Sequence, residues 1–517
     1  MPARGRPVLF IMIQLTGSSL TIEQLVAIAD DYEPVELARE AAGRVAASRA
    51  VVDRQAAGTA AVYGINTGFG ALAETAIPGD ALETLQLNLL RSHAAGVGEP
   101  LPVRAVRACM ALRANVLAKG YSGIRTSTLE HLIALLNRRV HPVVPSRGSV
   151  GASGDLAPLA HLALVLIGEG DAVVGDDSHT RSGREALAAA GLTPVTLAAK
   201  EGLALINGTQ PSAAIAALAL AGCERLARAA DIAAALSIDG LRGSVRPFDP
   251  RIHGARPYRG QVASADNIRR LLDGSGINAS HAGCGRVQDA YSLRCAAQVH
   301  GAAREALRFV RETVLIEANA ATDNPMVFAD EDEIVSGGNF HGAPIAVAAD
   351  LMTIAIAQLA TISERRSDRL VNPALSELPA FLTPNSGLQS GYMMAQVTAA
   401  ALTSEIKTLS HPASADTIPT SANREDHVSM SMGAALKAAR ALELATHVIA
   451  IEILFACQAV DLLSPLKTSA MLQRVHACVR ERVPALDGDR PPAPDIERIS
   501  RMIAEGSLEA VCAGEVK

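Results

Sequence analysis

Ala152-Ser153-Gly154 is the segment of this 517-residue chain whose residue types could build an electrophile from the backbone itself. In a tight bend, the Gly154 amide nitrogen can attack the Ala152 carbonyl carbon. Loss of two waters then leaves Ser153 as a dehydroalanine carbon in a five-membered ring. Gly154 suits this reaction because it has no Cβ to hinder the attack and can adopt backbone angles closed to other residues. The bare tripeptide is also common in loops, where it indicates only a turn.

Tyr63 opens a second glycine-rich loop, Tyr63-Gly64-Ile65-Asn66-Thr67-Gly68-Phe69-Gly70. The chain has only six tyrosines, so one in such a loop is a candidate for chemistry as well as for packing a turn against the core. A phenol is a weak base at neutral pH unless positive charge or hydrogen bonds stabilise its ionised form. The glycines lack the spacing of a Walker A or Gly-x-Gly-x-x-Gly loop, so the sequence does not support phosphate binding here.

A cation for a carboxylate is offered by the segment Gln288-Asp289-Ala290-Tyr291-Ser292-Leu293-Arg294-Cys295. On a helical turn, Tyr291 and Arg294 lie three residues apart and therefore face the same side. The guanidinium fork of Arg294 can bind a carboxylate through two hydrogen bonds, which fixes its orientation as well as balancing its charge. The alternative is an ordinary surface arginine at the start of a helix.

Four more side chains stand in distinctive contexts. Asn207 can donate and accept hydrogen bonds within a mostly apolar segment, although such a residue is commonly a helix cap. Phe340, after Gly337-Gly338-Asn339, fits a core position equally well. His93 and Glu425 could together give an imidazole ring a hydrogen-bonding partner and a carboxylate, whereas each alone is more commonly a satisfied histidine or a solvated glutamate.

With their flanking residues, these segments resemble the family of aromatic amino acid ammonia-lyases and aminomutases that carry the group 4-methylidene-imidazole-5-one (MIO), and most closely its histidine-acting branch. The tripeptide is preceded by Pro145-Ser146-Arg147-Gly148 and followed by Asp155-Leu156-Ala157-Pro158-Leu159-Ala160-His161. The match runs from about residue 16 to 512. It implies a MIO formed covalently from Ala152, Ser153 and Gly154, without a metal or diffusible cofactor. No His-Glu-x-x-His spacing occurs among the 13 histidines.

The resemblance also implies a role for each candidate side chain. Tyr63 would lie beside the substrate and act in proton transfer, and Arg294 would bind the substrate carboxylate. Tyr291 and Gln288 would lie beside the prosthetic group, and Asn207 next to its ring oxygen and the substrate amine. Phe340 would border the group. The implied catalytic residues are Tyr63, Ala152, Ser153, Gly154 and Tyr291, and the implied substrate-binding residues are His93, Asn207, Gln288, Arg294, Phe340 and Glu425.

The substrate expected from these residues is L-histidine, converted to trans-urocanate and ammonia. Relatives acting on phenylalanine or tyrosine typically carry Gln where Glu425 stands. Other positions depart from the histidine-acting pattern, namely Ala290, Gly342-Ala343-Pro344, Leu370-Val371-Asn372-Pro373 and Tyr392-Met393-Met394. The alternatives are a tyrosine or phenylalanine ammonia-lyase giving coumarate or cinnamate, and an aromatic amino acid 2,3-aminomutase. A non-catalytic scaffold is the reading with least support, because every residue needed for the electrophile is present.

Composition predicts a large helical enzyme. Aromatic residues make up 3% of the chain and Trp is absent, which favours helices over a β-sandwich. A net charge of -6 gives no electrostatic footprint for nucleic acid or an anionic membrane, and paired basic residues such as Arg365-Arg366 suggest solvated helix faces.

The seven cysteines, Cys284 among them, form no Cys-x-x-Cys pair and indicate reduced thiols in the cytoplasm. The uncharged stretch 202–223 is interrupted by polar residues and is not expected to span a membrane.

Apolar periodicity predicts long helices in the second half of the chain. Their alanine-rich faces suit close packing in a bundle and between subunits. The predicted helices cover about 211–236, 290–318, 344–370, 390–408 and 432–463.

The expected fold is mainly α, a long-helix bundle with a smaller loop-rich N-terminal region carrying the MIO segment. The expected organisation is an N-terminal extension at 1–15 (with Met12 an alternative start), the MIO-bearing region at 16–205, a central helical bundle at 206–480 and tail helices at 481–517. The resemblance further implies a homotetramer whose active sites are shared between subunits.

Overall fold

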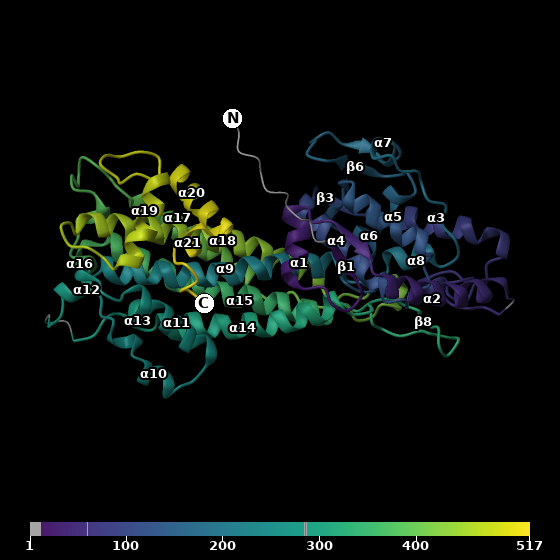
Figure 1. Ribbon diagram of the computed structural model, residues 1–517, viewed down its shortest axis with the longest axis horizontal. Coiled ribbons are helices and arrows are strands. Elements are labelled where there is room, and N and C mark those ends of the chain that lie inside the picture. The colour runs from purple at the N-terminus through teal and green to yellow at the C-terminus, as the bar shows by residue number, and fades with distance from the viewer. Residues whose placement is uncertain (1–11, 59, 284, 286) are drawn as a thin grey trace. The chain divides into compact units, whose positions relative to one another are not determined.

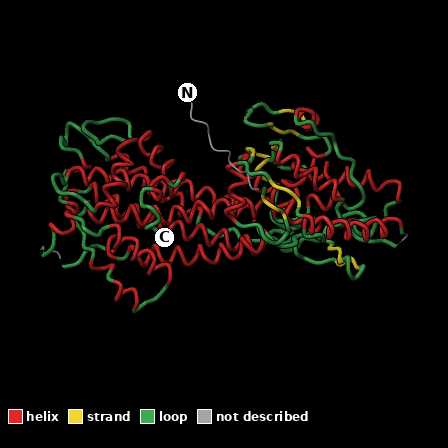
Figure 2. The backbone as a smooth tube through the Cα atoms, in the orientation of Figure 1, coloured by secondary structure: helices red, strands yellow, loops and turns green. Residues whose placement is uncertain are grey.

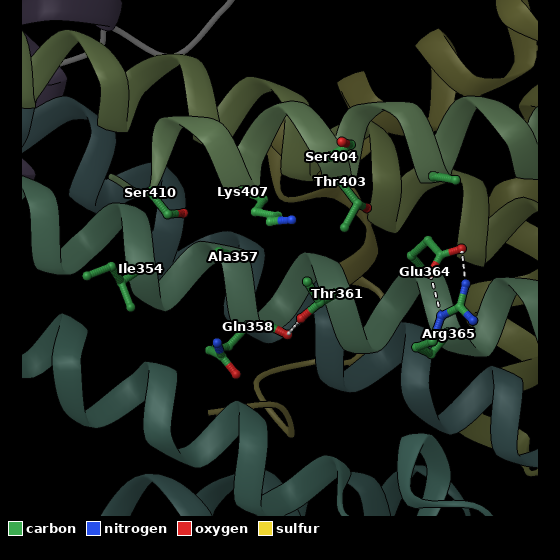
Figure 3. Close-up of a pocket in the computed structure, with 11 residues that line it drawn as sticks. Ile354, Ala357, Gln358, Thr361, Glu364, Arg365, Thr403, Ser404, Lys407 and Ser410 are labelled. Atoms are coloured by element: carbon green, nitrogen blue, oxygen red, sulfur yellow. Dashed lines mark hydrogen bonds and ion pairs between the residues drawn. The ribbon is translucent and has the colours of Figure 1, made fainter. Parts of the chain in front are cut away.

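Helices dominate the computed structural model, which describes residues 12–58, 60–283, 285 and 287–517 (Figures 1 and 2). Residues 1–11 of the predicted N-terminal extension, and Cys284, lie outside the described residues. The described chain divides into two compact units. Unit 1 comprises Met1–Leu218, Arg311–Ala349 and Pro412–Leu436, and unit 2 comprises Ala219–Val310, Asp350–His411 and Lys437–Lys517. The mainly α prediction is confirmed.

Unit 1 combines short helices with small sheets. Its strands form a parallel pair β1-β2, antiparallel pairs β3-β5 and β8-β9, and an antiparallel sheet β4-β6-β7. The strands are β1 (Ile13–Leu15), β2 (Val35–Leu37), β3 (Val97–Pro100), β4 (Val140–Pro142), β5 (Pro145–Arg147), β6 (Asp171–Val174), β7 (Arg181–Ser182), β8 (Met326–Phe328) and β9 (Glu333–Val335). Its helices and turns include α1 (Ile22–Val26), η1 (Ala27–Asp31), α2 (Arg39–Ala57), η2 (Gly70–Leu72), η3 (Gly79–Ala81), α3 (Leu82–His93), α4 (Val103–Ala118), α5 (Thr126–Asn137), α6 (Leu156–Leu166), α7 (Gly183–Ala189), α8 (Glu201–Ile206) and η6 (Ser421–Asn423).

Helix α4 is the buried centre of unit 1. Every residue from 105 to 118 is buried, including Arg107 and Arg113. Helix α4 packs against α5, α2 and α1, while α6 packs against α3, α7 and α8. Helix α6 therefore lies among other helices of unit 1, and it begins at Leu156, two residues after the Ala152–Gly154 turn.

The long helices lie where the periodicity predicts them. Predicted 211–236 is α9 (Gln210–Gly240), 344–370 is α15 (Ala343–Val371), 390–408 is α17 (Met393–Leu409) and 432–463 is α18 (Ser431–Leu462). Predicted 290–318 is broken at Cys295 into α13 (Tyr291–Arg294) and α14 (Ala296–Ala318). The other elements of unit 2 are η4 (Arg246–Phe248), α10 (Pro250–Gly254), α11 (Arg259–Leu271), α12 (Gly276–Ser280), α16 (Pro373–Ser376), η5 (Ala380–Leu382), α19 (Ala470–Arg482), α20 (Ala493–Glu505) and α21 (Ser507–Ala510).

Buried charges in unit 2 correct one expectation. Arg365 is exposed as predicted, but Arg366 is fully buried and pairs with the buried Glu452 of α18. Glu452 also accepts a hydrogen bond from Ser237 of α9 at 2.7 Å. The prediction of a solvated helix face was wrong for Arg366 because its counter-charge lies 86 residues away, where local sequence gives no sign of it. A buried guanidinium needs such a partner to offset its desolvation.

Two helices of the described chain, α15 and α18, are long and apolar enough to cross a membrane by length and composition. Of their most apolar stretches, 72% and 83% are buried inside the protein. That burial is typical of core helices, so these two helices are weak evidence for a membrane span.

Candidate active site

The Ala152–Gly154 segment forms a bend that only glycine allows at its end. Gly154 has a φ of 71°, in the left-handed region, and a Cβ at this position would collide with the backbone of Gly208. The two glycines pair in an isolated β-bridge, and the Asp155 amide donates to the Gly208 carbonyl at 2.8 Å. The C-terminal side of the tripeptide is therefore pressed against the turn between α8 and α9.

The N-terminal side of the bend is held by residues from the last part of unit 1. The Met430 amide donates to the Val150 carbonyl at 2.8 Å, and the Ser429 hydroxyl donates to the Gly151 carbonyl at 2.9 Å. A Cβ on Gly151 would collide with the hydroxyls of Ser429 and Ser431. The bend is thus fixed from both sides before any reaction takes place.

The Ser153 side chain points to a carboxylate. Its hydroxyl donates to Glu425 Oε1 at 2.7 Å, and Thr420 donates to Oε2 of the same carboxylate at 2.6 Å. Partial burial raises the pKa of Glu425, but the hydrogen bonds from Thr420 and Ser153 outweigh it, so the pKa lies below its usual value. Glu425 is therefore an anion at neutral pH.

His93 lies within electrostatic reach of that anion. Its Nδ1 is 2.9 Å from the Leu89 carbonyl oxygen, which can only accept, so Nδ1 carries the proton. Partial burial lowers the pKa of His93, against the opposing effects of the Leu89 carbonyl and the Glu425 charge. The ring is neutral at pH 7, and Nε2 is its acceptor nitrogen.

Asn207 caps the C-terminal end of α8 and reaches the tripeptide. Its Nδ2 donates to the Ser153 carbonyl oxygen at 2.9 Å. Its Oδ1 is buried and has no hydrogen-bond partner. Buried acceptors are normally satisfied, so this atom is suited to an amine that enters the site. The predicted candidates Ser153, Asn207, Glu425 and His93 thus lie together.

Tyr63 and Phe340 belong to the same unit. Both are half-buried, and the Gly70 amide lies 3.5 Å from Tyr63 Oη. The end of the Tyr63 loop, η2, contacts η6, which is next to Glu425 in the chain. Next to Phe340, the ring of His341 stacks on His427 with centroids 5.8 Å apart. These contacts place the Tyr63 loop beside the Glu425 loop.

Gln288, Tyr291 and Arg294 belong to unit 2, where the structure brings Tyr291 and Arg294 together. The guanidinium of Arg294 lies 4.6 Å from the centroid of the Tyr291 ring, on the same side of α13, as the spacing predicts. Tyr291 is 71% exposed, and Gln288 is exposed. The Arg294 Nε is buried without a partner. The face of the Tyr291 ring attracts the Arg294 guanidinium and so helps to hold that cation in place.

Three polar residues around the bend were missed as site residues. Asp155, fully buried, accepts from Ser149 Oγ at 2.6 Å and from the Ser212 amide at 2.9 Å, and burial raises its pKa. Thr420 holds Glu425. Arg113 donates to the Asn207 carbonyl at 2.9 Å. The position of Asp155 directly after the tripeptide was a usable signal, whereas nothing in the sequence links Arg113 to Asn207.

Comparisons with known proteins identify the relatives of this chain. Residues 20–481 match the family model of aromatic amino acid lyases. The chain is 57% identical over 502 residues to a histidine ammonia-lyase of Anaeromyxobacter dehalogenans, covering 96% of this chain and 99% of the relative. It is 54% identical over 498 residues to one of Myxococcus xanthus, covering 96% and 98%.

Solved structures show the same similarity. The histidine ammonia-lyase of Trypanosoma cruzi superposes with a TM-score of 0.92 at 45% identity, covering 98% of this chain and 96% of the other. The tyrosine aminomutase of Streptomyces globisporus superposes with a TM-score of 0.93 at 37% identity, covering 98% and 99%. The chain belongs to the aromatic amino acid lyase family.

Proposed function

We propose that this enzyme eliminates ammonia from L-histidine to give trans-urocanate. The observation that carries the proposal is the contact between Ser153 and Glu425, with His93 beside it. A carboxylate hydrogen-bonded to the residue that would become the electrophile, with a neutral imidazole interacting with that carboxylate, supports an imidazole-bearing substrate. Similarity to proteins named histidine ammonia-lyase, at up to 57% identity over almost the whole chain, supports the same substrate.

The residues at the bend fit a MIO formed from Ala152, Ser153 and Gly154. Gly154 has a left-handed φ of 71° and no Cβ to hinder attack by its amide nitrogen. Asn207 Nδ2 already donates to the Ser153 carbonyl, the oxygen that the ring would keep. The group would supply an electrophilic carbon for the substrate amine, which makes the amine a better leaving group.

The chain's own residues then bind and orient the amino acid. The Glu425 carboxylate accepts an imidazole N–H, and His93 Nε2 offers a second acceptor. Asn207 Oδ1, buried and unpaired, accepts from the amino group. Arg294 binds the carboxylate through its fork. Tyr63 Oη takes the β-proton, with Tyr291 and Gln288 beside the reacting group and Phe340 at its border.

A homotetramer in the cytoplasm, with each site completed by other subunits, belongs to the same proposal. Large apolar side chains are exposed along α15 and α17, among them Val347, Ile354, Met394 and Val397. Exposed apolar surface on long helices is typical of subunit interfaces. Sharing of sites would let Arg294 and Tyr291 of one subunit serve the bend of another. The proposed organisation remains an N-terminal MIO region, a central helical bundle and tail helices.

Incubation of the purified protein with L-histidine, L-tyrosine and L-phenylalanine, each alone, tests the proposal. We expect absorbance of urocanate to rise with histidine, and little or no coumarate or cinnamate from the other two. Chromatography for β-amino acids would detect the product of an aminomutase. This alternative is tested because the chain is similar to a tyrosine aminomutase structure. Coumarate as the main product, or a β-amino acid, would overturn the assignment.

A further inference from the structure

Arg113 is a fully buried cation one layer behind the candidate site. It belongs to α4, and its guanidinium reaches the end of α8. Nη1 donates to the Asn207 carbonyl at 2.9 Å and to Gln210 Oε1 at 2.7 Å, and Nη2 donates to the Ala204 carbonyl. Carbonyls at the end of a helix lack partners within that helix, so an outside donor fixes where the helix ends. Here one side chain holds two carbonyls, that of Ala204 in the last turn of α8 and that of Asn207, the C-cap residue of the helix.

The same guanidinium fits closely against Gly208. A Cβ on Gly208 would collide with Arg113 Nη1 and Gln210 Oε1. On its other side, Gly208 lies against Gly154 and accepts the Asp155 amide. Gln210 is held in turn by its Nε2, which donates to Thr322 Oγ1 at 2.6 Å. Arg113 therefore supports the backbone that bears both Asn207 and the contact with the tripeptide.

We infer that Arg113 is a positioning residue for the reaction, acting through Asn207. By holding the Ala204 and Asn207 carbonyls, it sets the direction of the Asn207 side chain, whose Nδ2 donates to Ser153 and whose Oδ1 faces no protein donor. A small rotation at Asn207 would move both amide atoms relative to the reacting group. The inference rests on the proposed function, and it adds a residue that does not touch the substrate.

The chemistry of the side chain makes the inference specific. A guanidinium has a planar fork that can hold two or three acceptors at once, whereas an ammonium is a point donor on a flexible stem. Arg113→Lys keeps the charge and part of the donor set, and Arg113→Gln removes the charge. We expect Arg113→Lys to lower kcat for histidine about 10-fold and Arg113→Gln about 100-fold or more, with KM changed less than kcat, because misplacement of an orienting group mainly affects turnover.

Arg107 provides a matched control on the same helix. It is also buried, 1% exposed, and it too donates to two backbone carbonyls, those of Ile28 at 2.9 Å and Leu136 at 3.0 Å. Neither carbonyl belongs to the tripeptide or to the turn between α8 and α9. We expect Arg107→Lys and Arg107→Gln to lower Tm while kcat stays within about twofold of wild type. Equal effects of the matched Arg113 and Arg107 variants on kcat would reduce Arg113 to a structural role and overturn the inference.

A double-mutant cycle with Asn207→Ala tests the route through Asn207. If Arg113 acts through that side chain, Arg113→Lys should lower kcat little further in the Asn207→Ala background. Fully additive losses of kcat from Arg113→Lys and Asn207→Ala would contradict the inference. This cycle does not need Arg113→Gln, so it remains decisive if that variant does not fold. Intact mass of each variant gives a readout besides turnover: we expect complete loss of two waters in Arg107→Gln and incomplete loss in Arg113→Gln. A wild type that loses two waters but ignores histidine would overturn the proposed substrate, whereas equal loss of water in Arg113→Gln and Arg107→Gln would count against Arg113 alone.

Discussion

At the scale of single residues, Glu425 holds the hydroxyl that the proposed cyclisation removes. Its Oε1 accepts from Ser153 at 2.7 Å, while Oε2 accepts from Thr420. Loss of the Ser153 hydroxyl as water would leave Oε1 without that donor and available to an imidazole N–H. A half-buried carboxylate oxygen without a donor is unfavourable, which gives a physical reason to reject phenylalanine. The Glu425 oxygen that now accepts from Ser153 would then select the substrate.

Glu425→Gln tests this account of specificity. The amide cannot balance the charge of an imidazolium and offers one acceptor instead of two, so histidine turnover should fall about 100-fold or more. Any side activity on tyrosine should fall much less. The measurement is kcat/KM on both amino acids for both proteins. A wild type that prefers tyrosine, with histidine turnover unaffected by the substitution, would place the enzyme in the aromatic branch.

Arg294 should be intolerant of lysine for a similar reason. Lysine keeps the charge but loses the planar fork that stacks on Tyr291 and can hold a carboxylate in one orientation. We expect Arg294→Lys to cost about 2–4 kcal/mol of transition-state stabilisation, measured as a fall in kcat/KM. Arg251→Lys, an exposed arginine of the same unit, serves as the control. Near wild-type kinetics for Arg294→Ala would refute the proposed carboxylate site.

At the scale of elements, the bend before α6 depends on the contact between two glycines. Gly154→Ala would place a Cβ against the Gly208 backbone at a φ of 71°. We expect a folded protein whose subunits keep both waters, because the bend cannot close. Gly175→Ala is the matched control, since Gly175 also has a left-handed φ, 66°, but open space around it. It should lose two waters like wild type and cost about 1–2 kcal/mol in stability, the ordinary penalty for an L-residue in the left-handed region. Complete dehydration of Gly154→Ala would contradict the role given to the bend.

The stability that the C-terminal end of α9 contributes to the fold depends on pH. Asp239 is buried and accepts from Ser275 at 2.9 and 2.8 Å and from Thr468, and burial raises its pKa from 3.8 to about 6. The folded chain therefore binds this proton more tightly than the unfolded chain. Since protons favour the folded state here, the contribution of Asp239 to stability is greatest below about pH 4 and falls as pH rises to about 6 and above.

Asp239→Asn removes that titration. The stability of the variant relative to wild type should increase by about 2–3 kcal/mol between about pH 4 and pH 7. Calorimetric Tm values of both proteins across this range give the comparison. Asp273→Asn, at an exposed position of the same unit, controls for loss of surface charge. A difference in Tm that does not vary with pH would show that Asp239 does not titrate as burial predicts.

At the scale of the whole molecule, periodicity located the long helices, because each buries a regular apolar face. Helices α15 and α17 begin and end within a few residues of the predicted ranges. The break at Cys295 was not predictable, since apolar residues continue through it. The short strands of unit 1 also gave no pattern, because three or four residues are too few for alternation to stand out.

Some residues in and around the candidate site could be predicted from the sequence, and others could not. The tripeptide, Glu425, His93 and Asn207 could be found because their motifs are contiguous in the sequence, and the structure adds their contacts. Arg113 and Arg366 could not, since the acceptors of their guanidiniums lie roughly 75 to 100 residues away along the chain. A buried charge is recognised from its partners, which only the fold brings close.

Intact mass spectrometry of the purified subunit tests the central claim most directly, because the proposed electrophile exists only if the chain has lost two waters. We predict a wild-type mass lower than the sequence mass by two waters, beyond any change at the N-terminus, with peptide mapping placing the loss at Ala152–Gly154. Ser153→Ala should fold, keep the sequence mass across this segment and lose nearly all activity on histidine. An unmodified Ala152–Gly154 segment in a wild-type enzyme that converts histidine to urocanate would contradict the account.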